Sequence, residues 1–390
     1  MTPLLPCLYL VPFLSFLHLG RRTPRLSHHA PSQGRPLSVV IPARNESANI
    51  GAVVSSILQS TYHPLEVVVL DDRSSDDTAA TVRGLMPGDP RLRVVTGSDL
   101  PDGWLGKPWA CVQGYRETSG ELIVFTDADT RHQPDLLGFA VGALEAENAA
   151  LVTIVPRVRC VTFWERVVMP QIFYLLAMRF LPRRINQARR IRDVIANGQF
   201  ILVTRASYER VGTHAAVRGA VAEDLALAQA YFRQGYRLHG AFAEDLMETR
   251  MYRTLRELVN GWSKNIFLGS RESYPAEPWR RALAPLVLVG VMLYWLAPVA
   301  LVGFAMSGVA SPVDAMAALI SCIVFWSLFP VAMKIPPWYG LGYPLGAAAV
   351  LFIVLRSIWR GSSRVEWRGR VYRNVGRVAE TAGRPEWGGP

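Results

Sequence analysis

Cysteine is scarce in this sequence, and neither cysteine nor histidine forms a recognisable motif. The four cysteines among 390 residues stand at positions 7, 111, 160 and 322. None of them forms a Cys-x-x-Cys pair, so we expect no structural disulfides and treat Cys111 and Cys160 as small apolar residues. The seven histidines show no His-Glu-x-x-His or other zinc spacing. We assign no role to Cys111 or Cys160. His132 lies just beyond an acidic motif and His239 in an expected strand, so a third metal ligand is one reading, and a satisfied or exposed histidine is the favoured one.

Acidic residues are outnumbered by basic ones, with 31 Asp and Glu against 42 Lys and Arg and a formal net charge of +11. No nucleic-acid-binding motif accompanies this excess, so we expect no nucleic acid partner. The basic residues instead stand beside apolar segments. Five arginines follow the aromatic-rich stretch 163–180, namely Arg183, Arg184, Arg189, Arg190 and Arg192. This pattern predicts an interfacial helix over about 162–184 whose arginines meet anionic lipid, with a buried core helix as the alternative.

Long apolar runs are confined to the second half of the chain. Residues 282–305 exceed the roughly 20 needed to cross a hydrocarbon core, and residues 313–333 are a second candidate. A third run, 341–355, is shorter. We therefore predict a transmembrane region over 282–358.

The chain ends add to the membrane prediction. Residues 1–20 lack the basic start and cleavage site of a secretory signal and are followed by arginines, which predicts an uncleaved anchor. The tail 359–390 is basic and is expected in the cytoplasm, as is the main domain. Three crossings after a cytoplasmic domain would leave this tail outside, so either 341–355 or one preceding run does not cross. The sequence leaves the number of spans open.

The most informative acidic motif follows an apolar strand. Residues 122–125 lead into Thr126-Asp127-Ala128-Asp129. Because side chains alternate along a strand, Asp127 and Asp129 can point the same way. Hard ions such as Mg²⁺ and Mn²⁺ take carboxylate and phosphate oxygens, so the motif predicts a divalent metal that holds a nucleotide diphosphate. Turn-forming or helix-capping aspartates are the alternative.

Further apolar strands at 38–42, 65–70 and 91–95 alternate with helical patterns. Such alternation predicts an α/β fold with a mostly parallel sheet, in which ligands bind beyond the carboxyl ends of the strands. The polar motifs of this half, Ala43 to Ser47 and Asp71 to Thr78, all follow strands.

In order and spacing these motifs resemble the family 2 glycosyltransferases, which have the GT-A fold. The likeness covers residues 36–270 and rests on 40–46, 69–78, Gly106-Lys107, Asp127-Ala128-Asp129 and Ala222-Glu223-Asp224. It implies a nucleotide-sugar donor bound by Pro42, Arg44, Glu46, Asp71, Asp72, Lys107, Asp127 and Ala128. It also implies that Asp127 and Asp129 hold the metal and that the pair Glu223-Asp224 supplies the catalytic base.

The chemistry of sugar transfer gives these residues separate tasks. Lys107 could stabilise the diphosphate leaving group together with the metal. Asp224 could take the proton of an acceptor hydroxyl that attacks the anomeric carbon from the opposite face, which inverts its configuration. Glu223 and Asp224 can also be read as ordinary carboxylates in the first turn of a helix.

Two further segments are candidates for the acceptor side. Asn197-Gly198-Gln199 could approach a ligand or could simply begin a strand. Trp262 and Lys264 lie where processive relatives carry Gln-x-x-Arg-Trp, which this chain lacks. Trp262 could stack on a sugar and Lys264 could meet phosphate, or their helix could pack Trp262 inward. The missing motif favours addition of a single sugar.

The carboxyl end carries a second resemblance. Residues 343–346 and 365–372 look like the end of a bacterial subgroup that glycosylates carotenoids, hopanoid-pathway lipids or related acceptors, although a juxtamembrane anchor of Trp, Tyr and Arg is an alternative reading. We therefore expect a membrane-bound inverting enzyme that moves one sugar from a nucleotide-sugar donor, with a UDP-sugar foremost, to a lipid hydroxyl. Polyprenyl phosphate is the alternative acceptor. A non-catalytic membrane scaffold or transporter subunit is the alternative of another class.

Overall fold

The computed structural model describes Tyr9 and residues 23–179, 181–361, 364–367 and 370–373. The predicted anchor over 1–20, apart from Tyr9, and the tail beyond 373 lie outside the described residues. The chain forms two compact units. The sheet unit comprises 24–157, 180–250 and 361–390, and the helical unit comprises 1–23, 158–179 and 251–360. The predicted catalytic domain over 36–270 thus draws residues from both units, and its limits stay a prediction.

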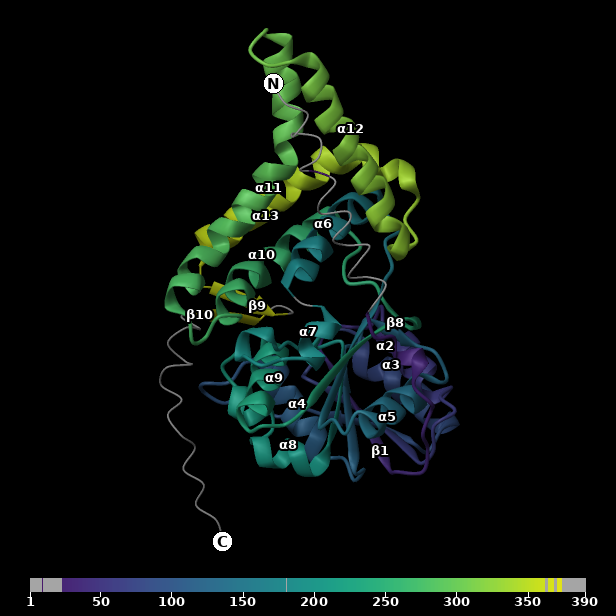
Figure 1. Cartoon of the computed structure of the whole chain (residues 1–390). Helices are drawn as coiled ribbons and strands as arrows, with labels where there is room; N and C mark the ends of the chain where they lie inside the picture. Colours follow the sequence, from purple (N-terminus) through teal and green to yellow (C-terminus); the bar gives the residue numbers. More distant parts are fainter. Residues whose placement is uncertain (1–8, 10–22, 180, 362–363, 368–369, 374–390) are drawn as a thin grey trace. The chain divides into compact units, whose positions relative to one another are not determined.

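The sheet unit contains a mixed eight-stranded sheet in the order β3-β2-β1-β4-β7-β6-β8-β5 (Figure 1). The strands are β1 (Leu37–Ala43), β2 (Leu65–Asp71), β3 (Leu92–Thr96), β4 (Leu122–Thr126), β5 (Thr130–His132), β6 (Leu151–Val158), β7 (Phe200–Thr204) and β8 (Leu238–Thr249). Strands β1 to β4 are parallel, whereas β7 runs antiparallel to β4 and β6, and β5 runs antiparallel to β8. The predicted α/β fold with a mixed sheet between helices is confirmed, and the parallel pairings lie among β1 to β4.

Helices cover both faces of this sheet (Figure 1). They are α2 (Ile50–Leu58), α3 (Thr78–Leu85), α4 (Gly106–Arg116), α5 (Leu136–Ala146), α7 (Pro182–Asn186), α8 (Arg205–Val211) and α9 (Glu223–Arg233), with short 3-10 turns η1 (Leu26–His28), η2 (Met86–Gly88), η3 (Ile191–Asp193) and η4 (His214–Val217). Successive side chains of β1 enter different apolar clusters, because strand side chains alternate. Val39 and Ile41 pack with α2 and α5, whereas Val40 packs with α4, α8 and α9.

The strand register brings the polar loops to one edge of the sheet. Ala43 pairs with Asp71, and Val40 pairs with Phe125. The chain therefore leaves β1, β2 and β4 at neighbouring points. The motifs that follow these strands share one edge, as the parallel arrangement predicts.

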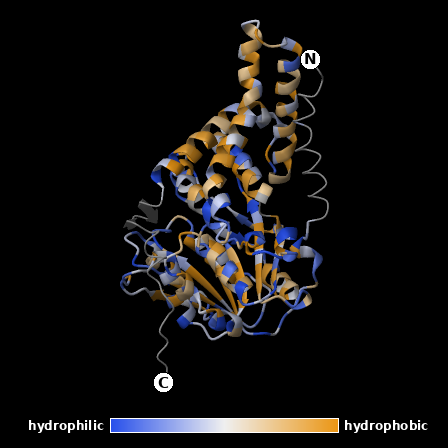
Figure 2. Cartoon of the chain, turned by 60° about the vertical axis from the view of Figure 1, so that its left-hand side comes forward, coloured by the Kyte–Doolittle hydropathy of each residue, from blue (hydrophilic) through white to orange (hydrophobic). Residues whose placement is uncertain are grey.

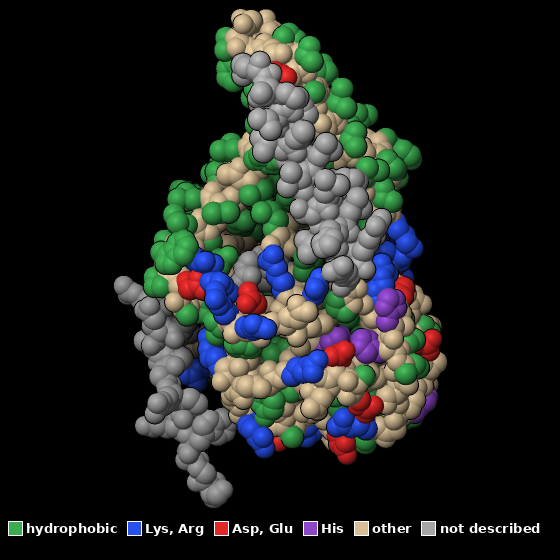
Figure 3. All heavy atoms as spheres, in the orientation of Figure 1, with side chains coloured by type: hydrophobic (Ala, Val, Ile, Leu, Met, Phe, Trp, Pro, Cys, Tyr) green, Lys and Arg blue, Asp and Glu red, His purple; other side chains and the backbone are tan. Residues whose placement is uncertain are grey.

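The helical unit contains α6 (Phe163–Arg179), α10 (Leu255–Glu272), α11 (Pro278–Met306), α12 (Pro312–Leu328), η5 (Phe329–Met333), η6 (Pro337–Gly342) and α13 (Tyr343–Arg360). Three of its segments are long and apolar enough to cross a membrane: Pro278–Met306, Pro312–Met333 and Pro337–Arg360. These helices are mostly hydrophobic in Figure 2, and apolar side chains cover much of their visible face in Figure 3. Leu286 and Val287, for example, are 62% and 56% exposed. Such a surface indicates association with a membrane.

Helix α6 packs one of its faces within the helical unit. Val168 and Ile172 are buried, and the amide of Gln171 donates a 2.7 Å hydrogen bond to the carbonyl of Tyr343 in α13. Phe163 remains 45% exposed. The alternative of a packed core helix therefore describes one face of α6, and the interfacial placement of the other stays a prediction.

Candidate active site

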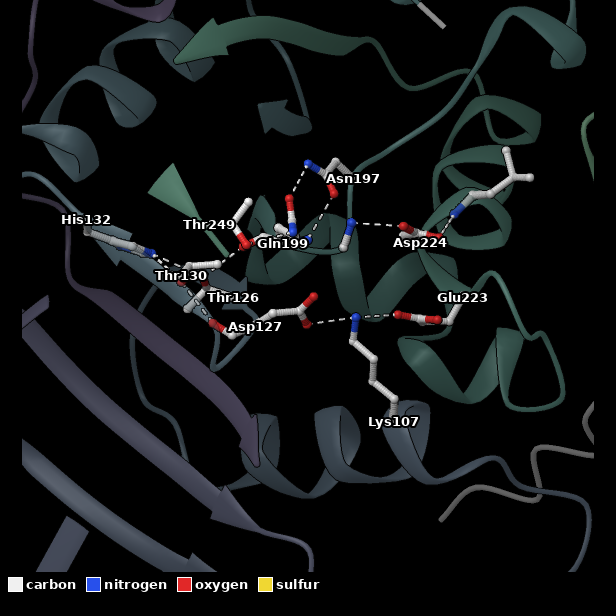
Figure 4. Close-up of polar contacts among 12 residues, drawn as sticks. Lys107, Thr126, Asp127, Thr130, His132, Asn197, Gln199, Glu223, Asp224 and Thr249 are labelled. Atoms are coloured by element: carbon white, nitrogen blue, oxygen red, sulfur yellow. Dashed lines mark hydrogen bonds and ion pairs between the residues drawn. The ribbon is translucent and has the colours of Figure 1, made fainter. Parts of the chain in front are cut away.

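A pocket of the sheet unit lies where β4 ends and where α4 and α9 begin (Figure 4). Its lining includes five of the predicted site residues, Pro42, Lys107, Asp127, Glu223 and Asp224. These residues are spread over more than 180 positions of the sequence, from 42 to 224. The fold therefore brings together residues that the sequence grouped only by motif.

Lys107 is the central charge of this pocket. It stands in the first turn of α4, and its Nζ lies 2.8 Å from Asp127 Oδ1 and 2.7 Å from Glu223 Oε1. Burial alone would lower the pKa of Lys107, but the attraction of the neighbouring carboxylates, Asp127 first, outweighs it and holds the pKa well above its usual value. The lysine therefore stays protonated and joins the end of β4 to the start of α9.

Glu223 and Asp224 occupy the first turn of α9 and differ in environment. Burial would raise the pKa of Glu223, but the ion pair with Lys107 lowers it below its usual value. Burial followed by the charge of Glu223 raises the pKa of Asp224 to about 6. Backbone N–H groups of Gly198 and Leu225 donate to its two oxygens at 2.9 and 2.7 Å. Asp224 is thus the better proton acceptor of the two near neutral pH.

Gly198 allows this close arrangement. A Cβ at position 198 would lie 2.8 Å from Lys107 Nζ and 3.2 Å from Asp224 Oδ2. A side chain at this position would therefore displace the lysine nitrogen and crowd the carboxylate. Of the two readings of Asn197-Gly198-Gln199, the structure favours close approach to the pocket over a plain strand start.

Hydrogen bonds fix the turn that carries Asp127 and Asp129. Thr130 Oγ1 donates to the Asp127 carbonyl at 2.9 Å, and Thr249 Oγ1 donates to the Asp129 carbonyl at 3.3 Å. Both aspartates are partly exposed, whereas Ala128 between them is buried in an apolar cluster. Asp129 Oδ1 is a buried oxygen of this turn, and carboxylate oxygens are the donors that Mg²⁺ and Mn²⁺ prefer. The residues present therefore fit a divalent ion.

His132 supports the same turn from below the surface. Its Nε2 lies 3.1 Å from Thr126 Oγ1 and 3.3 Å from Thr130 Oγ1 (Figure 4). Burial lowers its pKa to about 3, so the ring is neutral. With this nitrogen engaged by two threonines, the buried structural reading of His132 fits better than the reading as a metal ligand.

The predicted nucleoside-binding residues connect the loops after β1 and β2. Arg44 Nη1 donates to the carbonyls of Asp72 and Arg73, the latter at 3.2 Å. Asp71 Oδ1 accepts a 3.3 Å hydrogen bond from the N–H of Ser74, and Asp72 is fully buried. These residues, with Glu46, shape the loops rather than line the pocket around Lys107. Their contact with a nucleoside stays a prediction.

Glu46 belongs to the same loop after β1. Its N–H donates to Thr78 Oγ1 at 2.8 Å, and its Oε2 accepts a 3.0 Å hydrogen bond from Asn49. Asn45 and Arg73 have positive φ angles of 53° and 56°, a conformation that residues other than glycine adopt uncommonly. The loops after β1 and β2 are therefore held in specific turns at the edge where the ligand motifs meet.

Trp262 and Lys264 lie in α10 of the helical unit. The Trp262 side chain is 7% exposed and meets the rings of Phe173 and Tyr252 edge-on, with centroids 6.5 and 6.3 Å away. Inward packing, one of the two alternatives for this helix, therefore describes Trp262. Lys264 is partly exposed, and an acceptor-side role for these two residues stays a prediction.

Sequence reasoning missed several lining residues of the pocket, among them Cys111 and His214. His214 lies in η4, where its Nδ1 is 2.6 Å from the hydroxyl of Tyr208, and burial lowers its pKa to about 4. Burial raises the pKa of the Cys111 thiol, so this cysteine is not a thiolate nucleophile. Neither residue stands in a local motif, so only the fold could place them here.

A family model described as Glycosyl transferase family 2 matches residues 38–212. Residues 38–212 are thus similar to a family 2 glycosyl transferase domain, in agreement with the predicted family and enzyme class.

Curated relatives and a solved structure agree with the family. The chain is 28% identical over 249 residues to 4,4'-diaponeurosporenoate glycosyltransferase of Staphylococcus aureus strains MRSA252 and USA300. The matched part covers 62% of this chain and 63% of those relatives. The mannosyltransferase PcManGT from Pyrobaculum calidifontis, solved with GDP-Man and Mn²⁺, superposes with a TM-score of 0.52 at 21% identity. That superposition covers 92% of this chain and 99% of the other, and it shows that the two share the GT-A fold.

Proposed function

We propose that this protein is a membrane-bound inverting glycosyltransferase that moves a single sugar from a nucleotide-sugar donor to a lipid hydroxyl, such as that of a carotenoid or hopanoid-type lipid. The observation that carries the proposal is the charged pocket around Lys107. It combines a cation for a diphosphate with a carboxylate whose pKa lies near 6, and a single-displacement sugar transfer needs both.

The donor side of the proposal rests on Lys107, Asp127 and Asp129. A divalent ion bound by the two aspartates would neutralise the diphosphate and the charge that develops on it as the sugar leaves. Lys107 already faces Asp127 and would add a second positive charge at the same edge of the sheet. The Mn²⁺ bound with GDP-Man in PcManGT supports a metal in this role.

The acceptor side rests on Asp224. Its two oxygens accept backbone hydrogen bonds, which fix the carboxylate while leaving each oxygen a lone pair. Asp224 is ionised above its pKa of about 6 and can take the proton of an attacking hydroxyl. Because one displacement needs no covalent intermediate, the sugar's configuration inverts.

A lipid acceptor is supported by two independent observations. Three segments of the helical unit are apolar and long enough to span a membrane. The matched Staphylococcus relatives are named for glycosyl transfer to diaponeurosporenoate. We place the enzyme in the cell membrane as a multi-pass protein with its catalytic domain in the cytoplasm, where nucleotide sugars are made.

The proposal is tested by donor turnover of the purified full-length protein in detergent. UDP-sugars and GDP-sugars are offered with Mg²⁺ or Mn²⁺, together with long polyenes that carry a hydroxyl or carboxyl group and with polyprenyl phosphate. We expect a glycolipid product that Asp224→Asn abolishes and that the exposed control Asp245→Asn leaves unchanged. If the protein binds the nucleotides but forms no product with any combination of donor and acceptor, the catalytic proposal is refuted.

The same assay separates the two acceptor types. A phosphate or carboxylate acceptor already carries a negative charge and needs no strong base, so Asp224→Asn should then reduce turnover only mildly. A hydroxyl acceptor should lose at least about 10²-fold in rate, the usual contribution of a general base.

A further inference from the structure

Three potential metal ligands meet in the sheet unit outside the pocket around Lys107. His29 follows η1, Glu147 directly follows α5, and His239 lies in β8. One donor atom from each of the three lies within 4.8 Å of the other two. His29 Nε2 is 3.6 Å from Glu147 Oε1, and His239 Nδ1 is 3.9 Å from Glu147 Oε2.

These separations are close to those of a tetrahedral zinc site. With Zn²⁺ bonds to nitrogen and oxygen of about 2.0–2.2 Å, neighbouring ligand atoms lie about 3.3–3.6 Å apart. The two histidine–carboxylate distances, 3.6 and 3.9 Å, are near this spacing, and the upper limit of 4.8 Å among the three donor atoms means that the side chains would close by at most about 1.5 Å around a shared ion. The Glu147 side chain is 31% exposed, which leaves water access to a fourth position.

His29 is oriented as a metal ligand would be. Its Nδ1 lies 3.3 Å from the carbonyl oxygen of Leu26, to which only a protonated nitrogen can donate. Its other ring nitrogen, Nε2, faces the Glu147 carboxylate at 3.6 Å from Oε1, with room for an ion between the two atoms. A backbone carbonyl that fixes the second nitrogen is the usual support of a ligating histidine.

His239 lacks the hydrogen bonds that a buried histidine normally makes. The residue is 2% exposed, and its Nε2 is buried with no hydrogen-bond partner among the described residues. Its Nδ1 approaches Glu147 only to 3.9 Å, which is beyond hydrogen-bond distance. Its buried Nε2 is therefore left unsatisfied among the described residues, while its Nδ1 faces the Glu147 carboxylate, where an ion could lie between them.

Arg237 is the nearest competing cation. Its Nη2 donates to Glu147 Oε2 at 2.7 Å, which leaves Oε1, the oxygen nearer His29, free of this ion pair. A guanidinium on the second oxygen of a ligating carboxylate orients that carboxylate, although its charge weakens the attraction for a cation. The competing interpretation is a cluster in which a protonated His29 and Arg237 share Glu147 without any ion.

We propose that His29, Glu147 and His239 bind a divalent transition metal ion of the Zn²⁺ class, at a site separate from the donor's metal. Two imidazoles and one carboxylate suit such an ion, whereas Mg²⁺ prefers oxygen ligands alone. The ion would tie the segment before β1 to α5 and β8. That segment already meets β8 through the N–H of Phe242, which donates to the Pro24 carbonyl at 2.9 Å. The site therefore has a structural role.

The test uses full-length protein in detergent, purified without a histidine tag and stripped with a chelator. An Asp127→Asn, Asp129→Asn background removes the proposed donor metal site. We expect one Zn²⁺ per chain by metal analysis, a higher unfolding temperature with Zn²⁺, and visible absorption typical of tetrahedral Co²⁺ when Co²⁺ replaces it.

Matched variants assign the ligands. Glu147→Gln and His29→Gln should each weaken Zn²⁺ binding by at least about tenfold, since even the loss of an outer-shell partner costs that much. His28→Gln, at the exposed neighbour of His29, should bind as the parent does. Circular dichroism confirms that each variant is folded.

Two results would overturn the proposal. One is equal Zn²⁺ affinity in the parent and in both ligand variants. The other is a folded parent protein that gives no tetrahedral Co²⁺ spectrum and whose stability depends on pH but not on metal. This result would establish the ion-pair cluster instead.

Discussion

Replacement of Gly198 by alanine tests whether the position of Lys107 governs the reaction. The new Cβ would lie 2.8 Å from Lys107 Nζ and 3.2 Å from Asp224 Oδ2, whereas contacts of real Cβ atoms are rarely below 3.4 Å. The lysine nitrogen must therefore retreat by about 0.6 Å and the carboxylate by about 0.2 Å, given the spacing that packed atoms keep. The lysine cannot retreat without stretching its 2.8 and 2.7 Å contacts to Asp127 and Glu223.

The size of the effect follows from this displacement. A misplacement of about 1 Å at a reacting centre can cost about 10²-fold, so we expect kcat to fall roughly 10- to 100-fold. Stability should change by less than about 1 kcal/mol, because the displaced atom ends a flexible side chain and alanine restricts the unfolded chain. The acidic limb of the pH profile should also move upward, because a more distant Lys107 lowers the pKa of Asp224 less.

The assay measures kcat, its pH dependence and the unfolding temperature in detergent for Gly198→Ala beside Gly84→Ala. Gly84 lies in α3, and a Cβ there would meet nothing within 4 Å, so this control should keep the parent's rate. Unchanged kcat in a folded Gly198→Ala protein would refute the reasoning. A fall in kcat that occurs together with a large fall in the unfolding temperature would also refute it.

The charges of the pocket support three more predictions. The kcat/KM of the parent should rise with pH through about 6, because Asp224 must be ionised to accept a proton, and a flat profile would contradict this. Asp224→Asn should lose activity, and its unfolding temperature relative to that of the parent should rise between pH 4 and pH 8, although its amide can accept only one of the two backbone hydrogen bonds. The reason is that burial raises the folded-state pKa of Asp224, so its stabilising effect is complete below 3.8 and is lost as the pH rises through about 6. The same difference in unfolding temperature between variant and parent at pH 4 and at pH 8 would contradict this sign. Asp129→Asn should abolish stimulation by Mg²⁺ or Mn²⁺, with Asp245→Asn as control, and an unaltered response would remove Asp129 from the metal site.

Most of the fold could be predicted because its signals are local. Apolar strands followed by polar turns identified β1, β2, β3 and β4, and run length identified the three candidate spans. The antiparallel pairing of β7 with β4 and β6 could not be read in the same way. Pairing of strands distant in sequence depends on tertiary packing, and no turn motif joins these strands.

The sequence predicted those residues of the candidate site that belong to local motifs. It did not predict those that matter only because the fold brings them close to another site residue. Lys107, Asp127, Glu223 and Asp224 were expected together, and the structure places them around one pocket. The sequence left Gly198 undecided because glycine also marks turns. Its importance comes from the proximity of Lys107 Nζ, which depends on the packing of α4 against the sheet. The same limit hid the group formed by His29, Glu147 and His239, whose members are far apart in the chain.

The pocket shows how one lysine can divide two adjacent carboxylates into different roles. Glu223 and Asp224 share a helix terminus whose dipole favours both anions, so position alone does not distinguish them. Lys107 lies 2.7 Å from Glu223 and neutralises it, while burial and the charge of Glu223 act on Asp224 and raise its pKa to about 6. A base for a hydroxyl acceptor must be ionised in the cell yet basic enough to take a proton, and the proposed mechanism assigns that role to Asp224 because its pKa lies nearer to neutral pH than that of Glu223.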